Sequence, residues 1–280
     1  YLERQALPFV FTLYPGGGFG LALDRSDRTL ERIFASPLFR HVICTQRVTR
    51  DYLLERALCP EERIELVYGG VFPTDHLTRS MPKRQHYKLH KRTLDVCFVA
   101  LKYMPRGRDK GYDTFIAMAK RISRAHPDVA FHVVGPFDAS DVDVDGLEGR
   151  LTFYGSQATD FFPSFYARMD LIVSPNVPFV LAPGAFDGFP TGCCIEAGVC
   201  GTVVVCSDSL GLNTAFEADR EIVIVPPDVD ALCERIDRLH ADPVALVDLS
   251  IAGQAAFQRV FDVDAQMRPR LRLLERYLDG

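Results

Sequence analysis

Residues 186–201 form the segment that most limits the folds open to this chain, because two carboxylates and several glycines surround the predicted start of a helix. The apolar run 171–174 before it predicts a buried strand, and Thr191 is a suitable N-cap for a helix over about 191–199. In a parallel α/β sheet, such a strand–loop–helix turn places its loop at the carboxyl edge, where ligands bind. The unpaired backbone N–H groups and the positive helix end there suit a phosphate. The segment therefore predicts an α/β fold with a ligand site at that edge.

Two acids stand around this predicted helix. Asp187 precedes it, and Glu196 lies roughly one and a half turns beyond its N-cap. Carboxylates held away from water need hydrogen-bond donors, and sugar hydroxyls supply them, so the two acids could bind two parts of one nucleotide sugar. A loop turn followed by a solvated glutamate explains the local pattern equally well, since short motifs often match by chance.

Length and composition bound the class of protein. A chain of 280 residues favours two domains over one, and 48% hydrophobic residues with 25% charged ones are typical of a globular protein. The formal net charge of −5 argues against nucleic-acid binding as the main task, because phosphate backbones bind basic surfaces. No apolar run approaches the ~20 residues of a membrane span. Eight irregularly spaced cysteines predict reduced thiols and a cytoplasmic protein, and without a CxxC pair we expect no metal site.

Residues 1–73 predict three strands with helices between them. The strands are expected over 8–13, 41–45 and 64–68, and Ser26 is the candidate N-cap of the first helix. This βαβαβ order implies a parallel sheet covered by helices. A free-standing doubly wound domain normally has more strands, so we expect this region to be an incomplete Rossmann-like domain.

A glycine-rich loop follows the first predicted strand. Its bare backbone would let main-chain N–H groups approach a substrate, although it is not a GxGxxG motif and a flexible turn explains it equally well. We assign four of its residues to the acceptor side of the site: Tyr14, Gly16, Gly17 and Gly18.

The composition becomes basic between residues 74 and 93. Six cations face one acid, Asp75; they are Arg79, Lys83, Arg84, Lys88, Lys91 and Arg92. We interpret 74–93 as a basic linker between domains, most simply a solvated connector. The cations from 79 to 92 would also suit peripheral contact with an anionic membrane surface, which salt-sensitive liposome binding would reveal.

A second α/β unit is predicted over 94–260. Its first strand, 94–100, leads into a loop with four cations: Lys102, Arg106, Arg108 and Lys110. An acidic loop at 138–145 is expected to be solvated rather than to bind calcium. Residues 261–280 contain an amphipathic helix that we expect to pack back on the body, with a partner-binding helix as the lesser alternative.

The order of features in this unit carries a family resemblance. A cationic loop ends in Lys110-Gly111, later strands end at Gly135 and Gly155, and the segment DGFPT…IEAG follows. This order resembles the nucleotide-sugar-binding domain of glycosyltransferase family 4, the retaining group 1 glycosyltransferases of the GT-B fold, from residue 94 to about residue 230. The resemblance implies two Rossmann-like doubly wound parallel-sheet domains, with an acceptor-side domain that is incomplete here.

The resemblance also implies roles for individual residues. Two acids hold the donor in this family, the first at sugar hydroxyls and the second at the ribose, and Asp187 and Glu196 resemble them. A basic pair neutralises the diphosphate. Lys110 matches one member, and Lys102 is our choice for the other, with Arg106 and Arg108 as rivals. The further donor-binding positions that the resemblance implies are Gly135, Pro136, Gly155, Ser156, Gly188, Phe189, Pro190, Thr191 and Gly192.

This sequence departs from the family pattern in three ways. The first acid is Asp187 rather than a glutamate, and it lies nine positions before Glu196 instead of eight. Tyr14 and its glycines stand where family members often place a histidine near the sugar. We also expect the first strands of the acceptor-side domain to be absent from this chain.

The sequence thus predicts a retaining glycosyltransferase that moves a sugar from a nucleotide diphosphate sugar to an acceptor hydroxyl, without a cofactor, in glycan or polysaccharide biosynthesis. We expect a glycan, lipid-linked or small-molecule acceptor, in the cytoplasm or at the inner face of a membrane. One alternative is a module that binds a nucleotide or carbohydrate without turnover. Another is a sugar-nucleotide epimerase of the same architecture, but His41 and His132 are expected to be core histidines rather than catalysts.

Overall fold

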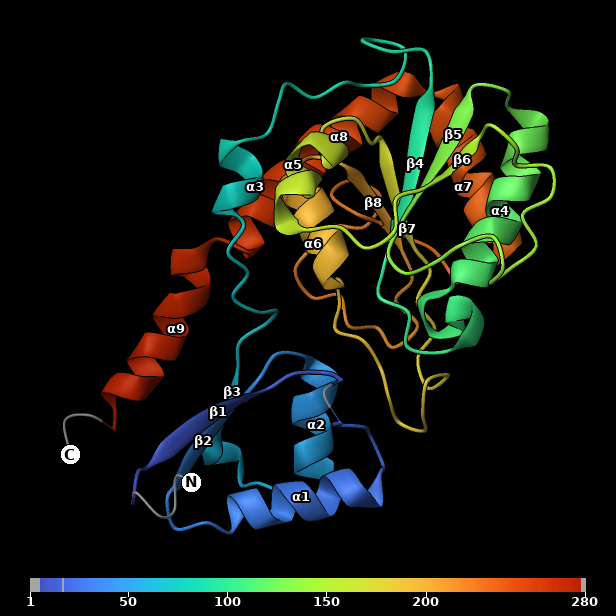
Figure 1. The fold of residues 1–280 in the computed structure, drawn as a ribbon. Coiled ribbons are helices and arrows are strands. Elements are labelled where there is room, and N and C mark those ends of the chain that lie inside the picture. Colours follow the sequence, from blue (N-terminus) through green and yellow to red (C-terminus); the bar gives the residue numbers. More distant parts are fainter. Residues whose placement is uncertain (1–5, 17, 278–280) are drawn as a thin grey trace.

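The computed structural model describes residues 6–16 and 18–277, and Figure 1 shows two parallel α/β parts joined by a connecting segment. The smaller part, here called the three-stranded unit (6–73), has the parallel strand order β1-β2-β3. Helices lie between successive strands, as parallel crossovers require. Its elements are β1 (Phe9–Leu13), α1 (Asp24–Phe34), β2 (Phe39–Cys44), α2 (Arg47–Glu55), η2 (Glu61–Arg63) and β3 (Ile64–Leu66).

The larger part, here called the six-stranded unit (94–260), has the all-parallel order β6-β5-β4-β7-β8-β9. Strands β4 and β7 are the first and fourth in sequence but neighbours in the sheet, so the winding reverses between them. Open α/β sheets bind ligands at such a switch point. The strands are β4 (Leu94–Val99), β5 (Val129–Val134), β6 (Leu151–Phe153), β7 (Leu171–Ser174), β8 (Val203–Cys206) and β9 (Val223–Ile224).

Helices cover both faces of the six-stranded sheet (Figure 1). Val96 and Phe98 of β4 pack toward α4 and α7, whereas Cys97 packs with the opposite face. Because both faces are buried, the strands read as almost continuous apolar runs. One face carries α4 (Tyr112–Ala125) and α7 (Val229–Ala241), the other carries α5 (Phe162–Tyr166), α6 (Gly192–Val199) and α8 (Pro243–Val260), and short turns η3 (Pro105–Lys110) and η4 (Thr159–Phe161) precede α4 and α5. The structure confirms the parallel α/β architecture predicted from the sequence.

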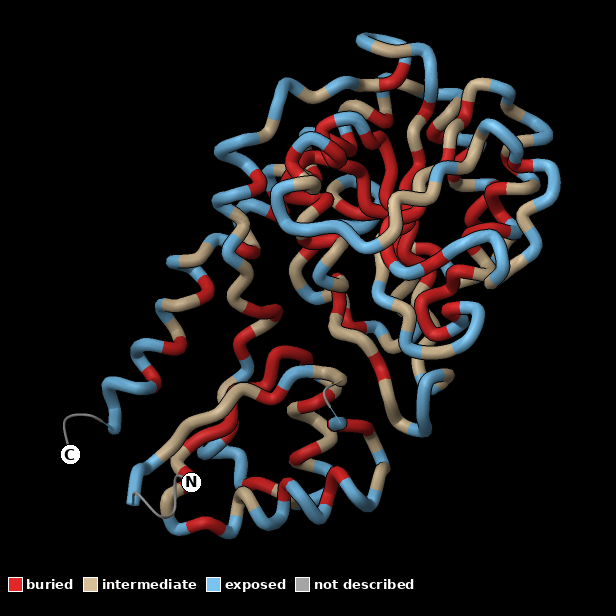
Figure 2. The backbone as a smooth tube through the Cα atoms, viewed as in Figure 1, coloured by how far each residue is buried: buried red, intermediate tan, exposed pale blue. Residues whose placement is uncertain are grey.

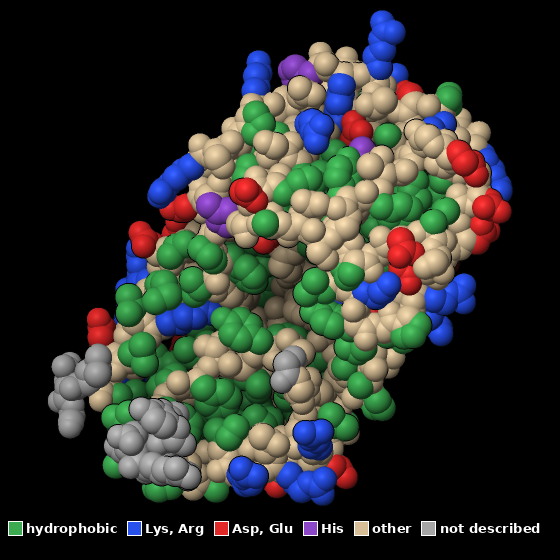
Figure 3. Space-filling view, in the orientation of Figure 1, with side chains coloured by type: hydrophobic (Ala, Val, Ile, Leu, Met, Phe, Trp, Pro, Cys, Tyr) green, Lys and Arg blue, Asp and Glu red, His purple; other side chains and the backbone are tan. Residues whose placement is uncertain are grey.

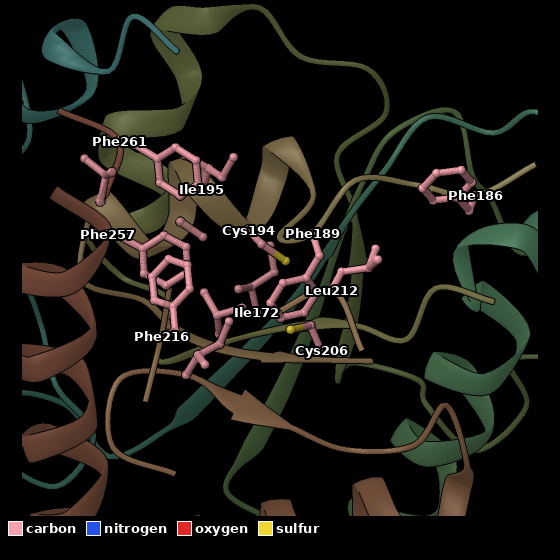
Figure 4. Close-up of a cluster of buried hydrophobic side chains, with 14 of the residues drawn as sticks. Ile172, Phe186, Phe189, Cys194, Ile195, Cys206, Leu212, Phe216, Phe257 and Phe261 are labelled. Atoms are coloured by element: carbon pink, nitrogen blue, oxygen red, sulfur yellow. The ribbon is translucent and has the colours of Figure 1, made fainter. Parts of the chain in front are cut away.

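The hydrophobic core is continuous between the two units. One cluster includes Leu13 and Val42 of the small sheet together with Ile172 of β7 and Phe257 of α8. Figure 4 shows Phe189 beside Cys194 and Leu212 in this cluster. Figure 2 shows that buried residues concentrate in the strands of the larger sheet, with exposed residues in the outer loops. The two units therefore share one continuous core.

The side chain of Ser26, which the sequence predicted as the N-cap of the first helix, instead joins α1 to the glycine-rich loop. Helix α1 begins at Asp24, and its N-cap, Leu23, makes no side-chain capping bond. The hydroxyl of Ser26 instead donates to the carbonyl of Gly18 and accepts from the amide of Gly20, both at 3.0 Å. The prediction that Ser26 caps α1 is therefore wrong, because the loop backbone claims its hydroxyl.

The connecting segment 74–93 is partly buried. It contains α3 (Asp75–Arg79), and the Tyr87 side chain is fully buried. The Arg84 guanidinium donates to the carbonyls of Met169 at 2.8 Å, Tyr166 at 3.0 Å and Cys200 at 3.1 Å. Burial lowers the pKa of Arg84 to about 10, and the carboxylate of Asp170 partly offsets this effect.

Lys91 is also used internally, because its ammonium pairs with Asp95 at 2.5 Å and with Asp170 at 2.7 Å. The expectation of a wholly solvated connector is therefore wrong for Arg84 and Lys91, whose charges are committed to the fold. Lys83 and Arg92 are exposed.

The last helix returns to the three-stranded unit. Helix α9 (Val263–Glu275) packs Leu273 against Ile43 and Val67. Beyond it, the Tyr277 hydroxyl lies 2.9 Å from Nδ1 of His41. Helix α9 and Tyr277 thus pack on the small sheet, and residues 278–280 lie outside the described part of the chain. Within residues 6–16 and 18–277, no helix has the length and apolar character needed to cross a membrane.

Candidate functional site

A cavity of about 470 Å³ opens at the carboxyl ends of β4 and β7, the switch point of the six-stranded sheet. We call it the donor cavity. Charged side chains from three separate segments line it: Lys110 from η3, Asp187 from the loop after β7, and Glu196 from α6. Gly135 and Ser156, which follow β5 and β6, line it as well. The structure therefore brings together residues that are far apart in the sequence.

Lys110 and Asp187 form an ion pair in this cavity. The ammonium lies 2.7 Å from Oδ1 and 2.8 Å from Oδ2 of Asp187. The Asn176 amide donates to Oδ2 at 2.6 Å, and the Ser174 hydroxyl donates to Oδ1 of Asn176 at 2.7 Å. This chain of contacts fixes the orientation of the Asp187 carboxylate above the end of β7.

The backbone around Lys110 is locked against the end of β7. Gly111 has φ 69°, and a Cβ at this position would lie 2.2 Å from the carbonyl oxygen of Pro175. The amide of Val177 donates to the carbonyl of Asp109 at 3.0 Å. Only glycine combines the left-handed conformation with this close approach. The K-G step therefore fixes the backbone that carries Lys110 at the edge of the cavity.

Asp109 provides a second, buried carboxylate beside Lys110. It is 3% exposed, and its Oδ2 lies 3.8 Å from the Lys110 ammonium. Among the described residues, neither of its carboxylate oxygens has a hydrogen-bond partner. Burial raises the pKa of Asp109, and Lys110 opposes that rise.

Glu196 faces the donor cavity from the second turn of α6. Burial raises the pKa of its carboxyl, with a smaller opposing effect from His76. Helix α6 begins at Gly192 with Thr191 as its N-cap, as the sequence predicted, although the Thr191 side chain makes no capping bond. The free amides of its first turn and its positive end lie at the cavity, because Thr191, Gly192 and Cys193 line it.

A second cavity, of about 190 Å³, lies between the two units, and we call it the inter-unit cavity. Asp187, Thr191 and Gly192 line both cavities, so the two adjoin. Figure 3 shows hydrophobic side chains around the hollow between the larger and smaller parts of the molecule. Residues from both units line this cavity: Tyr14, Pro15, Thr45, Gln46, Gly69, Gly70 and Phe72 from the small unit, and Asp187 to Gly192 with Ile195 from the large one.

The long loop between β7 and α6 contacts the small unit through hydrogen bonds and an aromatic pair. The Leu21 amide donates to the carbonyl of Gly184 at 2.9 Å, and the Gln46 side-chain amide donates to the carbonyl of Phe189 at 3.2 Å. The rings of Phe19 and Phe186 meet edge-on at 6.3 Å. Both ends of the segment that carries Asp187 are therefore held by the small unit.

Several predicted site residues lie outside the two cavities. The Lys102 ammonium lies 2.9 Å from Oδ2 of Asp141, in the acidic loop that was expected to be solvated, and not at the donor cavity. Arg106 and Arg108 are exposed, and Arg108 lies 3.9 Å from Asp113. Four more predicted residues line neither cavity: Pro136, Gly155, Gly16 and Gly18. Gly17 falls outside the described residues.

The two histidines considered for acid–base chemistry are structural. His132 contacts Asp95 at 2.8 Å and the Tyr154 hydroxyl at 3.0 Å, and His41 contacts Tyr277. No histidine appears among the lining residues described for the two cavities. Within the described part of the chain, no group of three or more His, Cys, Asp or Glu side chains is arranged to hold a metal ion.

Sequence reasoning missed several residues that line the two cavities, among them Asn176, Tyr103, Gln46 and Phe72. Asn176 had a weak signal, because it is a polar residue directly after a strand at the ligand edge. Tyr103 lies within the cationic loop, and its ring stands 5.1 Å from the Lys110 ammonium. Gln46 and Phe72 gave no local signal, because only the packing of one unit on the other brings them to the inter-unit cavity.

Over residues 95–242, a little more than half of the chain, the sequence matches the family described as Glycosyl transferases group 1. Comparison with curated proteins gives no match.

Solved structures with the same fold include a glycosyltransferase from Rickettsia africae ESF-5, with a TM-score of 0.71 and 14% identity over 97% of this chain and 71% of that chain. HepE of Anabaena in complex with UDP has a TM-score of 0.72 and 18% identity over 98% and 74%. Sucrose-phosphate synthase of Thermosynechococcus elongatus has a TM-score of 0.69 and 22% identity over 99% and 70%. At these identities the likeness establishes the fold, which is that of GT-B glycosyltransferases. With more than half of its length matching the family, the chain belongs to the group 1 glycosyl transferases.

Proposed function

We propose that the chain is a retaining glycosyltransferase of family 4, which transfers a sugar from a nucleoside diphosphate sugar to an acceptor hydroxyl. One observation carries the proposal: Lys110, Asp187 and Glu196 line a single cavity at the switch point of a Rossmann-like sheet. Such a cavity offers a cation for the diphosphate and carboxylates for hydroxyl groups.

The proposed roles follow from position. The diphosphate lies against Lys110 and the first turn of α6, where a cation and free amides stabilise charge on the departing nucleotide. Glu196 accepts hydrogen bonds from the ribose, and Asp187 accepts them from the transferred sugar. The base lies near Gly135 and Ser156, which line the cavity after β5 and β6.

The Lys110–Asp187 ion pair gives donor binding a definite cost. The ammonium that would meet the diphosphate is already paired with the carboxylate that would meet the sugar. A donor must exchange this pair for two new ones, Lys110 with phosphate and Asp187 with sugar hydroxyls. A complete nucleotide sugar satisfies both partners, whereas a free nucleotide satisfies one.

A thermal-shift panel of UDP, GDP, ADP and their common sugar conjugates tests the proposal. UDP and its sugar conjugates are tested first, because the Anabaena HepE structures contain UDP or UDP-glucose. A ligand at about 100 times its dissociation constant adds about 2.7 kcal/mol of stability. We expect one nucleotide to raise the melting temperature of the wild type, and Glu196→Ala to abolish the shift. No response to any member of the panel would contradict the assignment of the donor cavity.

The second candidate is a module that binds the nucleotide sugar without turnover. It is favoured by Lys102, which pairs with Asp141 and leaves Lys110 as the sole cation among the described residues that line the donor cavity. Nucleotide release from a bound donor, followed over hours in the presence of hydroxyl acceptors, separates the two candidates. Binding with no release would favour the module.

A further inference from the structure

The inter-unit cavity adjoins the position that the proposed function gives to the transferred sugar. It shares Asp187, Thr191 and Gly192 with the donor cavity. A group that enters it therefore comes next to the sugar carried by the donor. Its lining decides which acceptors reach that position.

Aromatic rings and bare backbone make up much of this lining. Gly70 sits between the rings of Tyr14 and Phe72, and a Cβ on it would lie 3.1 Å from both. A Cβ on Gly192 would lie 3.7 Å from the Phe72 ring. The rings therefore cover Gly70 and form this part of the wall. Aromatic faces bind the apolar faces of ring-shaped ligands.

The charge of the lining has one sign. Among the described residues that line the inter-unit cavity, Asp187 is the only carboxylate, and no Lys, Arg or His occurs. The neighbouring donor cavity has Lys110 against Asp187 and Glu196, and a bound diphosphate adds further negative charge. A phosphate or carboxylate on the acceptor would meet repulsion here without a counter-ion.

One buried cation, Arg270 of α9, lies outside this lining. The Arg270 side chain is 7% exposed and is not among the residues that line the inter-unit cavity. Its guanidinium donates to the carbonyl of Gln266 at 2.5 Å and to Oε1 of the same side chain at 3.0 Å. Both bonds come from Nη1 and stay within α9, and Nη2 is buried without a hydrogen-bond partner among the described residues.

We infer that the inter-unit cavity takes the accepting end of the acceptor as an uncharged, hydroxyl-bearing ring, so that neutral carbohydrates are used and sugar phosphates and uronates are rejected. The inference rests on the proposed function and adds the class of acceptor to it. Tyr14 and Phe72 contact the ring, and Asp187 contributes the repulsion that excludes anions.

The test measures nucleotide release by the full chain from UDP-glucose, GDP-mannose or ADP-glucose. Glucose, fructose and maltose are compared with glucose 6-phosphate, fructose 6-phosphate and glucuronate. A bound sugar either accepts the transferred group or blocks water, so binding changes the release rate in both cases. We expect saturable effects from neutral sugars at concentrations at least about tenfold below those needed for the charged ones.

Two substitutions at Tyr14, which is 47% exposed, make the test specific for charge. Tyr14→Leu should raise the neutral-sugar concentration for half effect about fivefold, through loss of the aromatic face. Tyr14→Lys places a cation in the lining and should shift the preference toward sugar phosphates by about tenfold relative to Tyr14→Leu. Tyr103→Ala, at an exposed tyrosine of the donor cavity, should instead raise the donor KM more than the acceptor KM.

The outcomes separate this inference from the proposed function. Sugar phosphates that change the rate of nucleotide release at lower concentrations than neutral sugars would overturn the inference alone. The inference would also fail if neither class changed this rate while the nucleotide was still released. An equal response of Tyr14→Lys and Tyr14→Leu to sugar phosphates would also count against it. A chain that neither binds nor consumes a nucleotide sugar would overturn the proposed function and the inference with it.

Discussion

The ammonium of Lys110 lies 2.7 Å from Oδ1 of Asp187, a residue 77 positions later in the chain. The contact exists because β4 and β7 are neighbours in the sheet, which brings the loops after them together at one edge. It also means that, without a ligand, the two residues proposed to hold the donor satisfy each other. Donor binding is then an exchange of partners.

Asp187→Asn should separate the affinity for a nucleotide from the capacity for transfer. Loss of the carboxylate frees Lys110, so we expect UDP to bind up to about fivefold more tightly, since a partly exposed ion pair contributes about 1 kcal/mol. Sugar transfer should fall strongly. Calorimetry with UDP and nucleotide-release assays measure the two effects, and UDP binding that weakens together with transfer would contradict the exchange.

Lys110→Met should weaken binding of a nucleoside diphosphate by about 1.5–3 kcal/mol, because a charged hydrogen bond to phosphate is lost. Lys102→Met is the matched control, since Lys102 lies in the same loop but pairs with Asp141. Isothermal calorimetry should show little change for the control. Equal losses of affinity in both variants would mean that Lys102 also binds the diphosphate.

Glu196→Gln should stabilise the empty protein at pH 7. Burial raises the pKa of Glu196 above its ordinary value of 4.5, so the folded state holds the proton more tightly than the unfolded state. The side chain therefore favours folding in its neutral, protonated form, and this contribution is lost as the pH rises through the folded pKa. The variant should therefore melt higher than the wild type at pH 7, and the difference should vanish below about pH 4.5. A difference in melting temperature that is the same at pH 4 and pH 7 would exclude this cause.

Gly111→Ala should destabilise the protein by more than about 2 kcal/mol. The left-handed backbone alone costs about 1–2 kcal/mol, and the added Cβ would lie 2.2 Å from the Pro175 carbonyl. Gly149→Ala provides the control, because Gly149 has φ 71° and a Cβ added there would meet nothing within 4 Å beyond its chain neighbours. Chemical denaturation measures both, and equal losses would mean that the contact with Pro175 is unimportant.

Arg84→Ala should cost about 2–4 kcal/mol of stability, because the carbonyls of Tyr166, Met169 and Cys200 lose a buried donor. Lys83→Ala, at the exposed neighbour, should stay within about 0.5 kcal/mol. Denaturant melts measure the contrast. Similar losses of stability in Arg84→Ala and Lys83→Ala would mean that Lys83 also contributes to the fold.

If basic residues of 74–93 also bind anionic vesicles, Lys83→Ala should weaken that binding.

Sequence patterns located the elements well where they depend on local chemistry. The apolar runs of β4, β5 and β7 and the N-cap position of α6 were predicted, because periodicity and capping depend on neighbouring residues. Ser26 was misplaced because its hydroxyl serves the backbone of the glycine-rich loop, a contact with no signature in the helix sequence itself.

The chain by itself thus determined a parallel α/β architecture and a carboxyl edge with Lys110, Asp187 and Glu196, because strand order and the turns at strand ends follow from local pattern. Tertiary structure alone decided that Lys102 turns to Asp141, that Asn176 orients Asp187, and that Gln46 and Phe72 complete a second cavity. The reason is physical: long polar side chains choose among partners that folding brings near, and those partners come from segments distant in sequence.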